Sequence, residues 1–299
     1  MFADSHIHLT HSCFSGEFCC LGWEDGSFLL QASNRNDLIN QLQRAGVGFC
    51  IEPGIELESN ARLLALSQKL PRFVYPAVGV HPTRTWSYTT LDEHNKKVRR
   101  RLYLSDFEQL RQYARRPGVV AIGETGLDYH HPHKEQHRLA QKYWFVRQLL
   151  LAHKLNLPVV LHIRAADADA LAILRLLHRQ LHGGVCHCFC GDAETAKAYT
   201  DLGLLLGIGG MLLQKPEKCA ALEDAVRRTS LESLVLETDG PYVNPFCPDL
   251  PEKQLRQARN TSLILPAVAE RIAAIKGISP EEVERVTTEN VRRVFRVPE

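Results

Sequence analysis

The sequence predicts an α/β protein of the (β/α)8 TIM-barrel class. Short apolar segments rich in β-branched residues alternate with longer segments of helical periodicity along the whole chain. Near-continuous apolar strands between amphipathic helices are typical of a parallel sheet covered by helices. Eight such units close into a barrel of about 250 residues, or more with insertions. The chain has 299 residues, of which 44% are hydrophobic, so we predict one domain over residues 1–299.

The individual elements follow this alternation in order. The candidate strands end near His8, Pro53, Val80, Glu124, His162, His187, Ile208 and Thr238. Helical patterns cover residues 36–45, 57–70, 104–116, 135–155, 167–181, 192–202 and 217–229, and two more, 263–276 and 280–295, follow the last strand. The β/α alternation is the only internal repetition, and the sequence contains no linker or low-complexity segment.

Two connections are long for this pattern, one after the first strand (residues 10–36) and one after the third (residues 82–105). Both follow strands, so both are expected over the C-terminal mouth of a barrel, where such barrels hold their active sites. Their aromatic residues either stack unpaired bases or pack the loops; these are Trp23, Trp86 and Tyr88. The basic run from Lys96 to Arg101 is either a contact with a nucleic-acid backbone or a solvated helix start.

Composition and charge exclude several classes of protein. The formal net charge of +2 gives no global field for nucleic acid, so a nucleic-acid partner must be held locally. The nine cysteines include no CxxC pair and are expected to be reduced thiols. We find neither a secretory signal nor an apolar run of the 18 or so residues that a membrane span needs. We therefore expect a cytoplasmic protein without membrane contact.

The most informative segment is Asp4-Ser5-His6-Ile7-His8, at the end of the first candidate strand. Side chains alternate faces along a strand, so His6 and His8 point the same way, roughly 6–7 Å apart, with Asp4 on the same face. Two imidazoles and a carboxylate suit a first-row divalent ion such as zinc or manganese. The alternative is a pair of ordinary histidines near a chain end, and the other strand ends argue against it.

Those strand ends also carry ligand-type side chains. The carboxyl ends of parallel strands meet at one rim of a barrel, which would bring together His6, His8, His81, Glu124, His162, His187 and Asp239. All of them except His81 are predicted ligands of one or two divalent cations. His81 is either a further ligand or a donor to the substrate. Arg164 shares the strand parity of His162, and its guanidinium either grips a phosphate or forms a salt bridge at the loop start.

Several neighbouring residues allow two interpretations. Glu237 has the parity of Asp239 and either orients the ligands from beneath or is a structurally paired carboxylate; Asp128 is equally open. The thiols of Cys186 and Cys188 flank His187, and parity turns them to the opposite face, which favours buried inert cysteines over a thiolate zinc site. The segment from His130 to His133 is either an accessory metal or phosphate contact or, as we favour, a solvated loop.

Six segments at the strand ends follow one another along the chain: Asp4-Ser5-His6-Ile7-His8, Gly79-Val80-His81-Pro82, Gly123-Glu124-Thr125-Gly126-Leu127-Asp128-Tyr129, Leu161-His162-Ile163-Arg164, His187-Cys188-Phe189 and Glu237-Thr238-Asp239-Gly240-Pro241-Tyr242. In this order they resemble the signatures of the TatD-like metal-dependent hydrolases of the amidohydrolase superfamily. The resemblance covers nearly the whole chain, from Asp4 to the terminal helix. It implies a barrel with a divalent metal centre and magnesium- or manganese-dependent deoxyribonuclease activity, often of the 3′-to-5′ exonuclease type.

The resemblance also implies a metal site for two divalent ions, magnesium, manganese or zinc. The implied ligands are His6 and His8 for the first ion, Glu124 as a bridge, His162 and His187 for the second ion, and Asp239 for the first. Two cations about 3.5–4 Å apart stabilise both the attacking and the leaving oxygen of an in-line displacement and lower the pKa of a bound water.

The implied catalytic residues overlap with these ligands. Asp239 would position or deprotonate the attacking water, Glu124 would hold both cations, and His81 and Arg164 would contact the scissile phosphate. The sequence thus predicts a metal-dependent phosphodiester hydrolase that acts on DNA, at single-stranded ends and from the 3′ end, without an obligate protein partner.

Two alternatives remain. One is an amidohydrolase-type enzyme for a small phosphoester, lactone or cyclic amide. Many such relatives carry a carboxylated lysine at the fourth strand end, where this chain has Glu124. The other is a nucleic-acid-binding protein that does not cut its ligand. The intact set of metal ligands argues against this alternative.

The chain departs from the family in its two long loops, in Gly240, and in Arg259-Asn260-Thr261, which lacks the expected Glu-Pro. These departures bear on substrate choice more than on metal binding.

Overall fold

The computed structural model describes residues 1–88, 96–130 and 135–298. The strands of the main sheet are β1 (Phe2–Asp4), β4 (Val47–Pro53), β5 (Val74–Val78), β6 (Ala121–Asp128), β7 (Val159–Arg164), β8 (Gly184–Cys186), β9 (Leu205–Ile208) and β10 (Leu234–Leu236). Their order in the sheet is their order along the chain. Six of them end at the predicted strand ends or up to four residues before, while β6 and β7 run four and two residues beyond their predicted ends.

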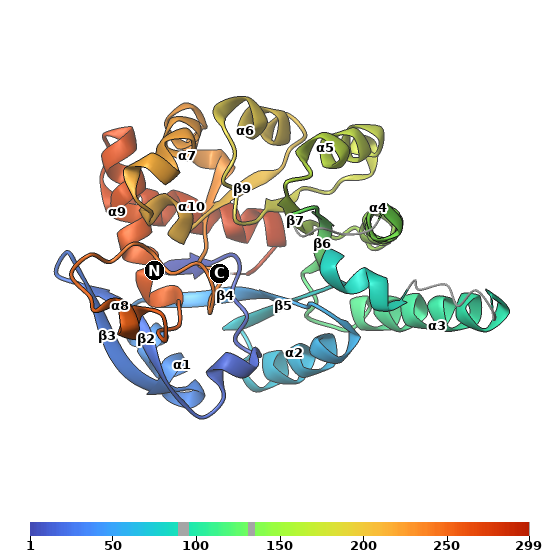
Figure 1. The fold of residues 1–299 in the computed structure, drawn as a ribbon, viewed down its shortest axis with the longest axis horizontal. Coiled ribbons are helices and arrows are strands. Elements are labelled where there is room, and N and C mark those ends of the chain that lie inside the picture. The colour runs from blue at the N-terminus through green and yellow to red at the C-terminus, as the bar shows by residue number, and fades with distance from the viewer. Residues whose placement is uncertain (89–95, 131–134, 299) are drawn as a thin grey trace. The chain divides into compact units, whose positions relative to one another are not determined.

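Helices connect these strands (Figure 1). They are α1 (Arg35–Arg44), α2 (Leu57–Lys69), α3 (Lys96–Ala114), α4 (Glu135–Leu155), α5 (Asp167–Leu176), α6 (Ala193–Thr200), α7 (Pro216–Arg228), α8 (Glu252–Leu255), α9 (Leu265–Lys276) and α10 (Pro280–Phe295). Side-chain caps fix several of their starts: Asp192 accepts from the backbone N–H of Thr195, and Ser279 accepts from that of Glu282. Among the described residues, no helix combines the length and apolarity that crossing a bilayer requires.

The connection after β1 holds a hairpin that the sequence analysis did not predict. Strands β2 (Glu17–Glu24) and β3 (Ser27–Asn34) pair antiparallel. Asp25 and Gly26 join them, with φ angles of 49° and 78°, as a two-residue hairpin turn of type I′ requires. The connection after β5 contains a 3-10 helix over Pro82–Tyr88, and α3 begins at Lys96. The backbone of the basic run therefore lies at the start of a helix.

The contacts divide the chain into two compact units, and the first comprises Met1–Glu52, Arg72–Val74 and His187–Glu299. In this unit β1 pairs with β4, and the backbone beyond β1 is held on both sides. Ser5 N–H donates to the carbonyl of Leu236 (2.9 Å), and Ile7 N–H donates to that of Ile51 (3.2 Å). Helix α10 packs against β1 and β10 and is the red end of the chain in Figure 1. Backbone hydrogen bonds from Ser5 and Ile7 thus hold the segment that carries His6 and His8 in place.

The second unit comprises Pro53–Pro71 and Tyr75–Cys186. Strands β5, β6, β7 and β8 pair parallel in it, with Ala77 opposite Ala121 and Asp128 opposite Arg164. Helix α4 packs on β6 and buries Trp144 completely. The prediction of one domain over residues 1–299 stays a prediction.

Candidate metal centre

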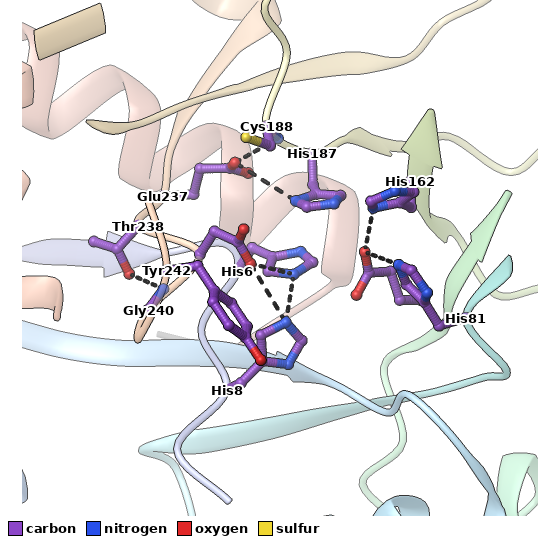
Figure 2. Close-up of polar contacts among 12 residues, drawn as sticks. His6, His8, His81, His162, His187, Cys188, Glu237, Thr238, Gly240 and Tyr242 are labelled. Carbon is purple, nitrogen blue, oxygen red and sulfur yellow. Dashed lines mark hydrogen bonds and ion pairs between the residues drawn. The ribbon is translucent and has the colours of Figure 1, made fainter. Parts of the chain in front are cut away.

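The first candidate cluster lies in the first unit, beyond the ends of β1 and β10 and just after β8. The Nε2 atoms of His6 and His8 are 3.2 Å apart, and Figure 2 shows the two imidazoles turned toward each other. These atoms lie 3.5 and 3.4 Å from Oδ1 of Asp239. The ring of His187 stacks on that of His6, with the centroids 3.8 Å apart. The structure thus brings together four of the predicted site residues.

Glu237 also belongs to this cluster, although it was not among the predicted ligands. Its Oε1 lies 3.8 Å from Nδ1 of His187, and His6, His187 and Glu237 are buried with ligand atoms that lie within 4.8 Å of one another. A Cβ on Gly207 would overlap the carboxylate, so this glycine makes room for it. Glu237 lies two residues before Asp239, so strand alternation places both on the same face; this was the sequence feature that could have identified Glu237 as a ligand.

Asp4 is occupied by structural hydrogen bonds. Its carboxylate accepts from the hydroxyls of Thr238 (2.7 Å) and Ser262 (2.6 Å) and from the backbone N–H of His6 (3.1 Å). Complete burial raises the pKa of Asp4 to about 6, although these hydrogen bonds act in the opposite direction. Asp4 therefore ties the end of β1 to the chain beyond β10, and it holds the backbone of His6 in place.

The second candidate cluster lies in the second unit and consists of His81, Glu124 and His162, whose ligand atoms also lie within 4.8 Å of one another. Oε1 of Glu124 is 2.8 Å from Nδ1 of His162 and 3.4 Å from Nε2 of His81, and Figure 2 shows both imidazoles. On its other side, Nε2 of His162 lies 3.3 Å from Oδ2 of Asp128.

The charges in this second cluster are strongly coupled. Burial disfavours the charged form of His162, but hydrogen bonds to Asp128 and Glu124 outweigh it and raise its pKa to about 9. Burial also opposes ionisation of Asp128, and the bond to His162 outweighs it and lowers the pKa of Asp128 to about 2. Two carboxylates therefore surround one imidazole, and this is an electrostatic environment that attracts a cation.

Three buried side-chain amides hold the strand ends of this unit. Asn60 of α2 pairs with both backbone groups of Gly79, at 2.8 and 3.1 Å. Gln148 of α4 does the same for Val80, at 2.8 and 3.0 Å, and Gln141 does so for Asp128, at 2.8 and 3.0 Å. Because His81 follows Val80 directly, two of these amides position its backbone.

Arg164, the remaining predicted site residue, ends β7. Its side chain is exposed, and its carbonyl accepts from the N–H of Tyr129 (2.8 Å). The predicted loop aromatics make contacts within the protein. Trp23 donates to Glu270 (3.0 Å), the ring centroids of Trp86 and His137 are 4.0 Å apart, and the Tyr88 hydroxyl accepts from a backbone N–H at 3.3 Å. These contacts favour loop packing.

The structure also bears on the two interpretations of the cysteines beside His187 and of the segment from His130 to His133. None of the candidate metal clusters among the described residues includes a cysteine, and Cys186 is buried. His130 N–H donates to Oδ1 of Asp128 (2.9 Å), whereas His131 and His133 lie outside the described residues. The ligand atoms in both clusters are imidazole nitrogens and carboxylate oxygens, a mixture that fits first-row divalent cations. The residues present therefore fit a divalent metal.

Known proteins similar to this chain include some that are named as metal-dependent hydrolases. Residues 3–296 match the model of the TatD related DNase family. The chain belongs to this family. It is 34% identical to YcfH of Escherichia coli K12, named as an uncharacterized metal-dependent hydrolase, over 88% of each chain. It is 31% identical to the 3′-5′ ssDNA/RNA exonuclease TatD of Pantoea vagans, over 89% of this chain and 95% of the relative.

The fold is shared as well. The crystal structure of YJJV, a TatD homologue from Escherichia coli K12, superposes with a TM-score of 0.76 at 26% identity and covers 99% of this chain and 98% of that chain. The predicted (β/α)8 fold class and the predicted family are therefore confirmed. The chain is a metal-dependent hydrolase of the TatD family.

Proposed function

We propose that this enzyme hydrolyses phosphodiester bonds of DNA, removing nucleotides from the 3′ end of single strands. Its cofactors are two divalent cations, magnesium, manganese or zinc, one in each cluster. The observation that carries the proposal is a pair of histidine–carboxylate groups, each with ligand atoms within 4.8 Å of one another: His6, His187 and Glu237 in the first cluster, and His81, Glu124 and His162 in the second. The exonuclease name of the Pantoea vagans relative supports the choice of substrate and polarity. The nine cysteines are all free thiols, which fits a cytoplasmic enzyme.

The first cluster would hold one cation and direct the water. His6, His8 and Glu237 would supply ligand atoms, and the stacking of His187 on His6 favours the same cation for His187. The family resemblance instead implies that His187 shares a cation with His162. When bound, a divalent cation lowers the pKa of a coordinated water and polarises the phosphate. Oδ1 of Asp239, within 3.5 Å of both imidazoles, would accept the proton of the attacking water.

The second cluster would hold the other cation through Glu124 and His162. The bridging role of Glu124 stays a prediction. Nδ1 of His81 accepts from the backbone N–H of Thr83 (3.2 Å), which places the proton of the neutral ring on Nε2. His81 would then donate from Nε2 to the scissile phosphate, and the exposed guanidinium of Arg164 would bind the same group as a fork.

The test uses 5′-labelled single-stranded DNA and metal-stripped protein reconstituted with magnesium, manganese or zinc. We expect a ladder that shortens from the 3′ end, with the rate reduced on the order of 100-fold or more in His6→Ala and in Glu124→Ala because each loses a ligand. His178→Ala is the matched control, because it removes an exposed histidine whose Nδ1 lies 3.0 Å from the carbonyl of Arg175. Intact DNA in the presence of bound metal would contradict the proposal and turn the search to small phosphoesters and lactones.

A further inference from the structure

A second group of polar residues lies beside the first metal cluster, around His11 in the loop after β1. We call Arg35, Arg259, His11 and Tyr242 the His11 group. Nη2 of Arg35 donates to the carbonyl of His11 (3.1 Å), and the Tyr242 hydroxyl lies 2.9 Å from Nε2 of His11. Burial, followed by the charges of His8 and Arg259, lowers the pKa of His11. The guanidinium of Arg35 thus contacts the loop directly, and that of Arg259 is close enough to influence His11 by its charge.

Both guanidinium groups have unused donors. The Nε atoms of Arg35 and Arg259 are buried and have no hydrogen-bond partner among the described residues. Nη1 of Arg259 donates to the carbonyl of Gln257 (2.8 Å). Glu52 is close enough to Arg35 to sense its charge. Its Oε1 accepts from the backbone N–H of Thr10 (2.6 Å), and its Oε2, like the two Nε atoms, is buried without a hydrogen-bond partner among the described residues. Buried polar groups are nearly always paired in proteins, and two free guanidinium donors beside a single carboxylate fit a further anionic acceptor.

Tyr242 connects this group to the metal cluster. Its ring meets that of His11 edge-on, with the centroids 5.4 Å apart, and that of His8 with the centroids 6.3 Å apart. Nδ1 of His11 accepts from the N–H of Cys13 (3.1 Å), so the neutral ring carries its proton on Nε2 and donates to the Tyr242 oxygen. Tyr242 is 44% exposed, and Figure 2 shows its ring beside His8. The aromatic face is therefore accessible within one side-chain length of a candidate metal ligand.

We propose that the His11 group is a subsite for the nucleotide next to the scissile bond, in which Arg35 and Arg259 bind its phosphate and the Tyr242 ring stacks against its base. The inference rests on the proposed function and adds the residues that recognise the strand. Guanidinium groups bind phosphate as forks, and an exposed aromatic face stacks on bases of any sequence. A local site of this kind is also what a chain of net charge +2 needs in order to hold a polyanion.

The test compares two substrates of the manganese-loaded enzyme. A single-stranded oligonucleotide reaches the subsite, whereas bis-p-nitrophenyl phosphate reaches only the metal centre. Arg35→Gln and Arg259→Gln are expected to raise KM for the oligonucleotide by roughly 5- to 10-fold with little change in kcat. Each should reduce the salt slope of kcat/KM by about 0.7 per lost phosphate contact, and turnover of the small ester should stay within about 2-fold.

Arg256→Gln is the matched control, because Arg256 is exposed, pairs with Glu252 and carries the same charge. Arg259→Lys should recover part of the oligonucleotide KM. Cleavage of DNA by the wild type with an unchanged KM in the double variant Arg35→Gln/Arg259→Gln would overturn the subsite and leave the proposed function standing. An equal loss on the small ester would also overturn it.

Binding of a fluorescein-labelled oligonucleotide, measured by anisotropy, separates the two hypotheses. If the wild type binds but does not cut, and the double variant does not bind, the subsite is supported while the nuclease proposal fails. If the wild type neither binds nor cuts, both are overturned. Thermal unfolding midpoints of the variants within a few degrees of the wild type will show that the differences arise in a folded protein.

Discussion

Two buried carboxylic acids hold the backbone on either side of the His6–His8 pair. Asp4 accepts from the N–H of His6, and Glu52 accepts from the N–H of Thr10. Neither occurs in a candidate metal cluster of the described residues. Fixing the peptides around a short segment restricts the orientation of its side chains, and metal affinity depends on such support. The strand parity of Asp4 predicted which face it lies on, but only its partners, Thr238 and Ser262, show that its oxygens are already used.

The buried position of Glu52 predicts a pH-dependent stability. Burial raises its pKa from 4.5 to about 7, against the hydrogen bond from Thr10. The folded state therefore binds the proton more tightly than the unfolded chain, so the stabilisation is complete below about pH 4.5 and is lost as the pH rises through about 7. The difference between 4.5 and about 7 corresponds to roughly 3 kcal/mol.

Urea unfolding of wild type and Glu52→Gln at pH 5 and pH 8 measures this effect. Because glutamine does not ionise and can still accept from Thr10, the variant should be more stable relative to wild type at pH 8 than at pH 5, by at most roughly 3 kcal/mol. Glu17→Gln, at an exposed position of β2, is the control and should follow the wild type. Identical pH profiles of wild type and Glu52→Gln would contradict the assigned pKa.

At the scale of the elements, helices α2 and α4 do more than cover the sheet. Each sends amide side chains into the strand ends, where they replace water as partners of otherwise unpaired peptide groups. The helices themselves were predictable, since their periodicity and caps are local. Their amide partners were not, because Gln148 and Val80 are 68 residues apart. The β2–β3 hairpin had a local signal, Asp25-Gly26, but its strands lack the clean alternation that would have distinguished them from a loop.

Removing one of these amides should affect both stability and the site. Gln148 is fully buried and also donates to the Thr125 hydroxyl (2.7 Å). Gln148→Leu leaves the peptide groups of Val80 without partners, so we expect the free energy of unfolding to fall by about 2–4 kcal/mol. Metal affinity of the cluster that contains His81 should fall with it.

The matched control is Gln109→Leu on α3, whose side chain is exposed and donates to the Tyr113 hydroxyl (2.9 Å). Its stability should stay within about 0.5 kcal/mol of the wild type. Urea unfolding and isothermal titration with manganese check both expectations. Equal losses of unfolding free energy and manganese affinity in the two variants would show that the hydrogen bonds to Val80 contribute no more than an exposed hydrogen bond does.

At the scale of the whole molecule, the order of the strands was the strongest prediction. A parallel sheet in chain order places all strand ends at one edge, so ligand-type residues scattered from His6 to Asp239 could be grouped from the sequence alone. How the ligands are shared was not predictable. The stacking of His187 on His6 and the space left by Gly207 for Glu237 depend on side-chain packing between segments that are distant in sequence.

If each cluster holds its own cation, metal should stabilise the folded protein in two separable steps. A ligand that binds only the folded state adds about 2.7 kcal/mol at 100 times its dissociation constant. For a chain of 299 residues that corresponds to a rise of roughly 4 °C in Tm per ion. Stripping the metal should therefore lower Tm, and adding manganese should restore it in a concentration-dependent manner.

The variants assign the two increments without any measurement of activity. His6→Ala should lose the rise in Tm that comes from the first cluster and keep the rise from the second, whereas Glu124→Ala should do the reverse. The double variant should be insensitive to manganese, because both sets of ligands are then incomplete. Loss of the entire increment in either single variant would contradict two independently held ions, and a wild-type Tm that manganese does not change would contradict metal binding at both clusters.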